Sequence, residues 1–321
     1  MADLKWKEAI AIDCSTLKPT DLNSAACREA LALFDSNIVR AIGVAIVPVF
    51  TAIAADAFAT AINARLRKHV EQGKLPTESE TREIAKTTFV HAANLMGKTH
   101  DDKGATQNVL VMVMEWACNT MAEPDIQDSF EGVLKSVIIQ SWTAFETLAE
   151  DLWERTLNEH PHRLAGLEGK PSDRAQRQED EIEKSVLLYQ LHKHSYNLSG
   201  VMGTILKEQF NFTVLSRVRR AYMAAFAKDR DDIRAALYDE SLDAVALIRN
   251  LLVHKNGVID QKFLDDSSNI AALASIRSKG LRQPVVFDGK MVRELVQPMI
   301  KCAASLIQSV DIWLTNHPAP Q

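Results

Sequence analysis

Hydrophobic side chains recur at steps of three and four residues along most of this chain, and this spacing constrains its fold most strongly. The spacing gathers them on one face of an α-helix, because a helix completes a turn in about 3.6 residues. Glycine and proline, which interrupt helices, account for only 12 and 10 of the 321 residues. The sequence therefore predicts an all-α protein with little sheet.

A polar segment around Pro124 divides the helical pattern. Proline breaks a helix, and Asp128 or Ser129 can cap the one that follows. We therefore predict an N-terminal helical region of unknown role over residues 1–125 and a second helical domain over residues 126–321. In the second domain, helices are predicted at residues 130–153, 180–194, 214–237, 241–255 and 290–315.

The cysteines and the apolar segments indicate where the protein works. Cys14, Cys27, Cys118 and Cys302 match neither a zinc site nor a disulfide framework, so they are expected to be reduced thiols. The N-terminus lacks the apolar core of a secretory signal. The longest apolar run, residues 41–55, is shorter than the roughly 20 residues that a membrane-spanning helix needs. We expect a cytoplasmic protein with no membrane partner.

Polar residues interrupt the apolar helix that is predicted to end near residue 255. Arg249, Asn250, His254 and Lys255 lie in this stretch, and Asn256-Gly257 is a helix-stop signal. On an ideal helix Asn250 and His254 share a face, whereas Arg249 lies about 140° away from His254. Arg249 can therefore meet His254 only through its long side chain or across a subunit interface.

This stretch resembles the shared motif of the HEPN superfamily, an arginine, usually followed by a polar residue, and a histidine a few positions beyond. The match is Arg249-Asn250-x3-His254, with an aromatic and acidic pattern upstream at residues 142–146. The similarity covers about residues 128–316. It implies a helical bundle of HEPN type and a homodimer in which the active helices of two protomers face one another.

The activity that the resemblance implies is metal-independent endoribonuclease chemistry, in which a ribose 2′-hydroxyl attacks the adjacent phosphodiester. His254 would be the general acid and base, because histidine titrates near neutral pH. Arg249 would stabilise charge on the phosphate, and Asn250 would orient the histidine or the phosphate. No cofactor is expected, and no histidine, cysteine and carboxylate residues have the spacing of a metal site.

The overall charge of the chain limits how it can bind RNA. A net charge of −5 gives no global attraction to nucleic acid, so any contact with RNA must be local. Lys255 and the basic run of Arg217, Arg219 and Arg220 are the candidate RNA-binding residues. A short basic run on a helix is more often a solvated face, so both interpretations of this run stay open.

A structural role for the motif is the alternative to catalysis. Arg249 and Asn250 could cap carbonyls or pair with Asp243 or Asp260, and the arginine–histidine spacing recurs at Arg155 and His160. Two functions therefore remain. One is an endoribonuclease of the toxin–antitoxin or phage-defence kind, with an antitoxin or a defence complex as its partner. The other is a non-catalytic HEPN-like module that binds a nucleotide or a protein.

Overall fold

The structure, a computed structural model, describes residues 12–14, 19–46, 67, 77–84, 87, 124–165 and 188–318. Within these residues the chain forms helices and no strand, and its one isolated β-bridge joins Val258 and Pro284. The prediction of an all-α fold is confirmed. No helix in the described ranges is long and apolar enough to cross a membrane.

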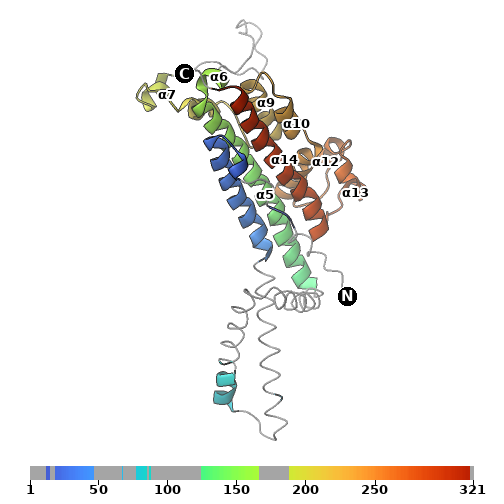
Figure 1. The fold of residues 1–321 in the computed structure, drawn as a ribbon. Coiled ribbons are helices and arrows are strands. Elements are labelled where there is room, and N and C mark those ends of the chain that lie inside the picture. Colours follow the sequence, from blue (N-terminus) through green and yellow to red (C-terminus); the bar gives the residue numbers. More distant parts are fainter. Residues whose placement is uncertain are drawn as a thin grey trace.

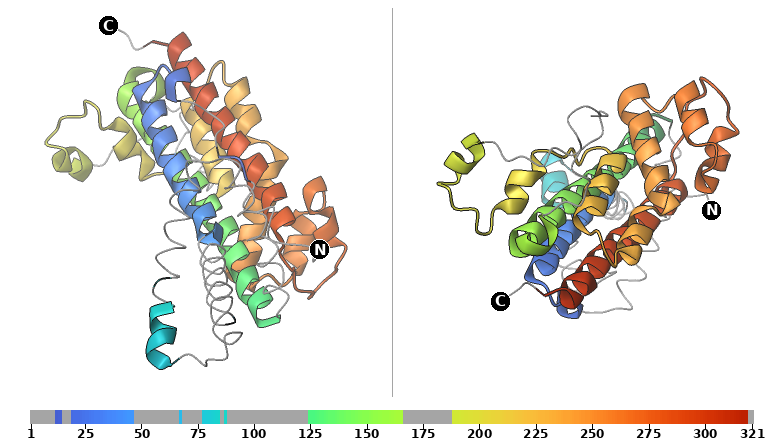
Figure 2. Two further views of the ribbon diagram at one scale, coloured as in Figure 1. Left: turned by 60° about the horizontal axis from the view of Figure 1, so that its bottom comes forward. Right: turned by 90° about the horizontal axis from the view of Figure 1, so that it is seen from above.

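Three long helices form the body of the molecule: α5 (Pro124–Glu159), α14 (Gly289–Asn316) and an N-terminal helix over residues 25–46. Figures 1 and 2 show them running side by side. A fourth helix, α11 (Glu240–Lys255), packs against both α5 and α14. The shorter elements are η1 (Pro19–Asp21), α6 (Pro161–Leu164), α7 (Leu188–Lys193), α8 (Met202–Lys207), α9 (Leu215–Ala225), α10 (Asp231–Leu237), α12 (Gln261–Asp266), η2 (Ala271–Leu273) and α13 (Ala274–Arg277).

The predicted apolar stripe of α5 lies in the centre of the core. Phe145 and Trp153 of this stripe are fully buried. Two buried polar groups also join α5 to α9: the Trp153 indole donates to the carbonyl of Ala221 at 3.0 Å, and the Tyr222 hydroxyl donates to that of Ala149 at 2.9 Å. Both aromatic side chains thus bury apolar area while their polar ends stay hydrogen-bonded.

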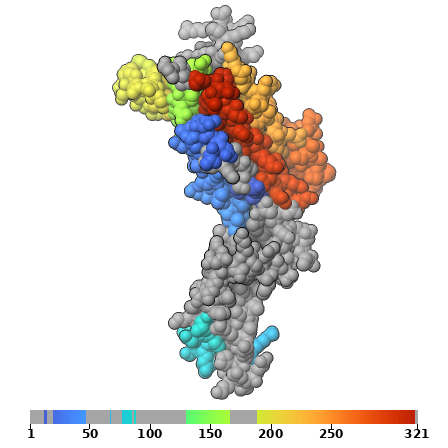
Figure 3. All heavy atoms as spheres, viewed as in Figure 1, coloured from blue at the N-terminus to red at the C-terminus, as the bar shows by residue number. Residues whose placement is uncertain are grey.

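The N-terminal helix belongs to the same core. Leu31, Phe34 and Ile38 on this helix are buried in one hydrophobic cluster with α5 and α14, and Figure 3 shows the helix adjoining α14 on one face of the molecule. The buried carboxylate of Asp311 on α14 accepts the backbone N–H groups of Asn23 at 3.0 Å and of Ser24 at 2.7 Å. These residues immediately precede the helix, so Asp311 anchors its N-terminus.

The predicted N-terminal region of residues 1–125 is described only in part, and that part packs against the second domain. Its described part over residues 19–46 shares the core of the second domain. Most of the rest of the region lies outside the described residues. The division of the chain at residue 125 therefore stays a prediction.

Replacing Asp311 with alanine should lower the free energy of unfolding by about 2 kcal/mol, because charge-assisted hydrogen bonds to the start of a helix are lost. Urea unfolding followed by circular dichroism would measure the loss. The control is Glu294→Ala, which removes an exposed carboxylate from the same helix and should cost less than about 0.5 kcal/mol. Equal losses in the two variants would contradict an anchoring role for Asp311.

The single helix predicted over residues 214–237 is wrong, since a turn separates α9 from α10. In this turn Asp229 has a φ of +49°, a left-handed geometry that a continuing helix excludes. The turn is held by α14: the Trp313 indole donates to the carbonyl of Lys228 at 2.7 Å, and its ring packs edge-on against Phe226.

The predicted helices at 241–255 and 290–315 are confirmed as α11 and α14.

Candidate functional site

The candidate site lies on the C-terminal half of α11, and the local sequence explains where this helix begins and ends. At its start the Asp239 side chain accepts the backbone N–H of Ser241 at 2.9 Å. At its end Asn256 and Gly257 adopt left-handed φ angles of +51° and +79°, and the N–H of Gly257 donates to Leu251 at 3.1 Å. The predicted stop signal is therefore confirmed, and it fixes the last turn of α11.

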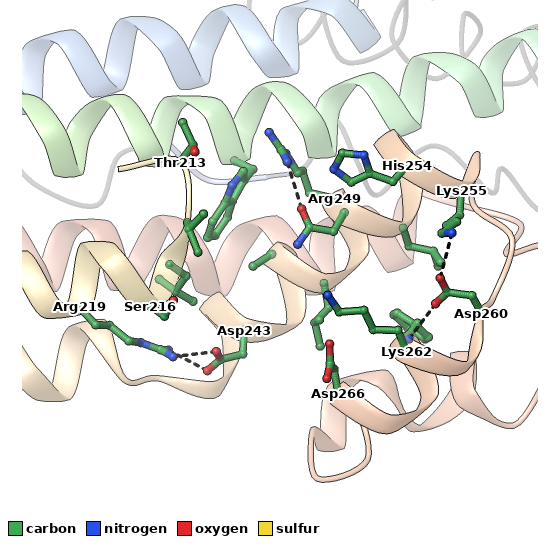
Figure 4. Close-up of a pocket in the computed structure, with 18 residues that line it drawn as sticks. Thr213, Ser216, Arg219, Asp243, Arg249, His254, Lys255, Asp260, Lys262 and Asp266 are labelled. Carbon is green, nitrogen blue, oxygen red and sulfur yellow. Dashed lines mark hydrogen bonds and ion pairs between the residues drawn. The ribbon is translucent and has the colours of Figure 1, made fainter. Parts of the chain in front are cut away.

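A pocket of about 910 Å³ opens beside this helix. Its walls are α11, the start of α9, α12 with its preceding residues, and Trp142 of α5. Arg249, Asn250, His254 and Lys255 all line the pocket, so the structure brings the predicted motif together in one cavity. Figure 4 shows the side chains of Arg249 and His254 extending from α11 toward α5. The two side chains therefore extend to the same side of α11, although their positions on the helix are about 140° apart.

Arg249 is partly buried and carries a charge that no described carboxylate pairs with. Its Nη1 donates to Oδ1 of Asn250 at 3.0 Å. Its Nε is buried and has no hydrogen-bond partner within the described part of the chain. The alternative partners that the sequence offered are occupied, because Asp243 pairs with Arg219 and Asp260 with Lys255. A capping or ion-pairing role for Arg249 therefore finds no support among these residues.

Glu146 on α5 supplies negative charge near Arg249. Burial raises the pKa of Glu146 above its usual range, while a hydrogen bond from Trp142 and the charge of Arg249 act in the opposite direction. The bond from the Trp142 indole to the Glu146 carboxylate measures 2.6 Å. Glu146 is thus close enough to Arg249 to interact electrostatically, although the two side chains form no direct ion pair in the described structure.

His254 lies at the solvent-exposed edge of the pocket. It makes no hydrogen bond or ion pair with any described residue, and it is exposed. A structural histidine in a core would be enclosed and hydrogen-bonded. His254 instead has a ring that solvent or a ligand can reach, as proton transfer to a bound substrate requires.

The second arginine–histidine pair occupies a different setting. Arg155 donates to Asp151 at 2.7 Å and also pairs with Glu29. His160 immediately precedes α6, and burial lowers its pKa. Neither residue lines the pocket. Arg155 therefore has the structural role that was considered for Arg249, and it links α5 to the N-terminal helix.

Arg219 was predicted to bind RNA, and it reaches the wall of the pocket. Both ends of its guanidinium donate to the Asp243 carboxylate at 2.8 Å, and its Nε donates to the carbonyl of Leu237 at 2.8 Å. The group also lies over the ring of Tyr238, 4.7 Å from its centre. Through these contacts Arg219 joins α9, α10 and α11, and its guanidinium is already hydrogen-bonded within the protein.

The other predicted RNA-binding residues divide into two groups. Lys255 lines the pocket and forms a long ion pair with Asp260 at 3.5 Å. Arg217 and Arg220 lie outside the pocket lining, and Arg217 is exposed. The structure adds Lys262, on α12, which the sequence did not single out because it belongs to no recognisable motif. A lysine soon after the helix stop is the only signal that would have pointed to it.

Comparison with known proteins identifies no relative. No protein-family profile, curated protein or solved structure matches the chain. In the described ranges, no cluster of three or more histidine, cysteine or carboxylate side chains is arranged to hold a metal ion. The functional argument therefore rests on the pocket itself, where an arginine without a carboxylate partner, an amide and an exposed imidazole stand together on one helix.

Proposed function

We propose that the protein is a metal-independent endoribonuclease of HEPN type and that the pocket around Arg249, Asn250 and His254 is its active site. One observation carries the proposal. The partly buried guanidinium of Arg249 opens onto a pocket beside an exposed imidazole, and it pairs with no described carboxylate. Glu146 is close enough to interact with this charge but forms no ion pair with it, so the guanidinium keeps donors for a ligand. A phosphate group is the ligand that its planar fork binds best.

RNA supplies its own nucleophile in this reaction. The 2′-hydroxyl attacks the adjacent phosphorus and loses its proton to a base, while the bond to the 5′-oxygen breaks and that oxygen receives a proton from an acid. The products are a 2′,3′-cyclic phosphate and a 5′-hydroxyl. His254 performs one of the two proton transfers. In the homodimer that the sequence resemblance implies, the partner protomer's copy of this histidine would perform the other.

Arg249 and Asn250 act on the phosphate. The guanidinium stabilises the negative charge that grows on the phosphate oxygens during attack. The Oδ1 atom of Asn250 accepts the bond from Arg249, which leaves the amide N–H groups free to donate to the same phosphate or to the ribose. The three residues thus divide charge stabilisation, orientation and proton transfer among them.

The sequence resemblance also suggests where such a nuclease would act and which partner it would have. A cytoplasmic toxin or phage-defence effector would need a partner that restrains it, such as an antitoxin. The competing function is a non-catalytic module that binds a nucleotide or a protein, and one feature favours it: the described pocket lining contains a single histidine. The cleavage assay below separates the two functions.

The wild-type protein, treated with EDTA, should cut a labelled tRNA pool and leave 2′,3′-cyclic phosphate ends. Arg249→Ala should slow cleavage about 10²-fold, the usual loss when one charge-stabilising donor is removed. Arg155→Ala, which removes the arginine of the second motif copy, is the matched control and should cut at the wild-type rate. Intact RNA with the wild-type protein, together with binding of a nucleotide, would instead support the non-catalytic module.

A further inference from the structure

Lys262 extends from α12 into the pocket. It lies among the lining residues, and Figure 4 shows its side chain directed from α12 toward α11. The motif residues Arg249 and His254 extend from α11 on the side of α5, so Lys262 places a second positive charge on a different wall. The pocket therefore offers cations at two separate positions.

The pairing of the lining cations distinguishes Lys262 from its neighbours. Arg219 is held at both ends by Asp243, and Lys255 pairs with Asp260. Lys262 forms no ion pair with a described carboxylate, although Asp266 lies four residues further along the same short helix. Within the described chain, Lys262 and Arg249 are thus the two lining cations without a carboxylate partner.

The size of the pocket suits a ligand with more than one phosphate. Its volume of about 910 Å³ approaches the upper end of the range, about 300–1,000 Å³, that encloses drug-sized ligands. Arg249 and Lys262 lie on different walls of this pocket. A ligand that reaches both cations therefore needs anionic groups at two positions.

We propose that Lys262 binds a second backbone phosphate, next to the phosphate held by Arg249, so that the site takes an RNA chain rather than a mononucleotide. The inference rests on the proposed function, because it assumes that Arg249 binds the reacting phosphate. An ammonium group binds phosphate as a compact point charge and tolerates the varied geometry of a flexible chain. Lys262 would therefore hold the chain in place and take no part in the chemical step.

The test measures binding of 2′-O-methyl RNA, which lacks the attacking hydroxyl, to the full-length protein. Two probes are used: a dinucleotide with one phosphate and a tetranucleotide with three. Lys262→Ala should raise the Kd of the tetranucleotide about fivefold, the effect of losing one partly exposed ion pair, and leave that of the dinucleotide unchanged. The salt dependence of tetranucleotide binding should become shallower, with the slope of log K against log salt falling by about 0.7 for one lost phosphate contact.

Two control variants make this test specific. Lys262→Arg should bind like the wild type because it keeps the charge. Lys290→Ala removes an exposed lysine that lies outside the pocket lining near Glu294 and should change neither the Kd nor the salt slope.

The possible failures are distinguishable. If the tetranucleotide binds the wild type and Lys262→Ala equally, with the same salt slope, the second phosphate site is wrong and the nuclease proposal stands. A Kd that rises equally for both probes would place Lys262 at the same phosphate as Arg249 and would also overturn the inference. If neither probe binds the wild type and RNA stays intact, the proposed function fails with it.

Discussion

Replacing His254 with alanine should slow RNA cleavage about 10³-fold, within the range that a positioned general acid or base contributes. The fold should be unchanged, because His254 is exposed and makes no hydrogen bond with a described residue. Single-turnover cleavage of end-labelled tRNA would measure the rate, and circular dichroism with thermal unfolding would show that the helices are intact. A loss of activity without a loss of stability is the result expected of a proton-transfer group.

His160→Ala is the matched control for this variant. His160 also follows an arginine by five residues, but it precedes α6 and lies outside the pocket lining. Its replacement should leave the cleavage rate at the wild-type level. Equal cleavage by wild type and His254→Ala would show that another group, or a contaminating nuclease, cuts the RNA, and the assignment of the active site would then be wrong.

Replacing Gly203 with alanine should destabilise the protein by about 3 kcal/mol, at the upper end of the usual cost of overpacking. Gly203 lies in α8, which packs against α5. A Cβ atom at this position would lie 2.1 Å from the backbone oxygen of Glu154, and backbone cannot move aside as a flexible side chain can. The N–H of Gly203 also donates to the Asn158 side chain at 2.7 Å, so the shift would weaken that bond as well.

Urea unfolding of Gly203→Ala and Gly132→Ala would test this close approach. Gly132 lies within α5, and a Cβ atom there would meet nothing within 4 Å. Since alanine favours a helix interior, Gly132→Ala should raise the stability by about 0.5–1 kcal/mol. If both variants shifted the unfolding midpoint in the same direction, the close approach of α8 to the Glu154 backbone would not be what makes Gly203 necessary.

The sequence was sufficient for the long helices and insufficient where distant segments decide the structure. α5, α11 and α14 each carry enough regularly spaced apolar residues to be recognised locally. The turn between α9 and α10 depends on Trp313, which contacts Lys228 across 85 residues of sequence. Periodicity contains no information about such a contact, so the helix was predicted to continue through the turn.

In the candidate site, too, the sequence was sufficient for local features and insufficient for contacts between distant segments. Arg249, Asn250 and His254 were identified from their spacing, and the structure places all three in one pocket. Arg219 also reaches the pocket, but Asp243, on another helix, holds both ends of its guanidinium. Lys262 carries no motif, and only the folded position of α12 brings it to the pocket. A basic residue can be found in a sequence, whereas its ion-pair partner depends on the tertiary structure.

The contact between Asn23 and Asp311 also has a consequence for biosynthesis. The two residues are 288 positions apart, which a ribosome working at about 5–20 residues per second covers in about 15–60 s. Throughout that interval the start of the N-terminal helix lacks the Asp311 carboxylate that accepts its N–H groups in the folded protein. α11 packs against α14 too, so the pocket acquires its final shape only after α14 has been added. His254 completes the motif 62 positions before α14 ends at Asn316, so the nascent chain carries the whole motif for about 3–12 s before that motif lies in a finished site.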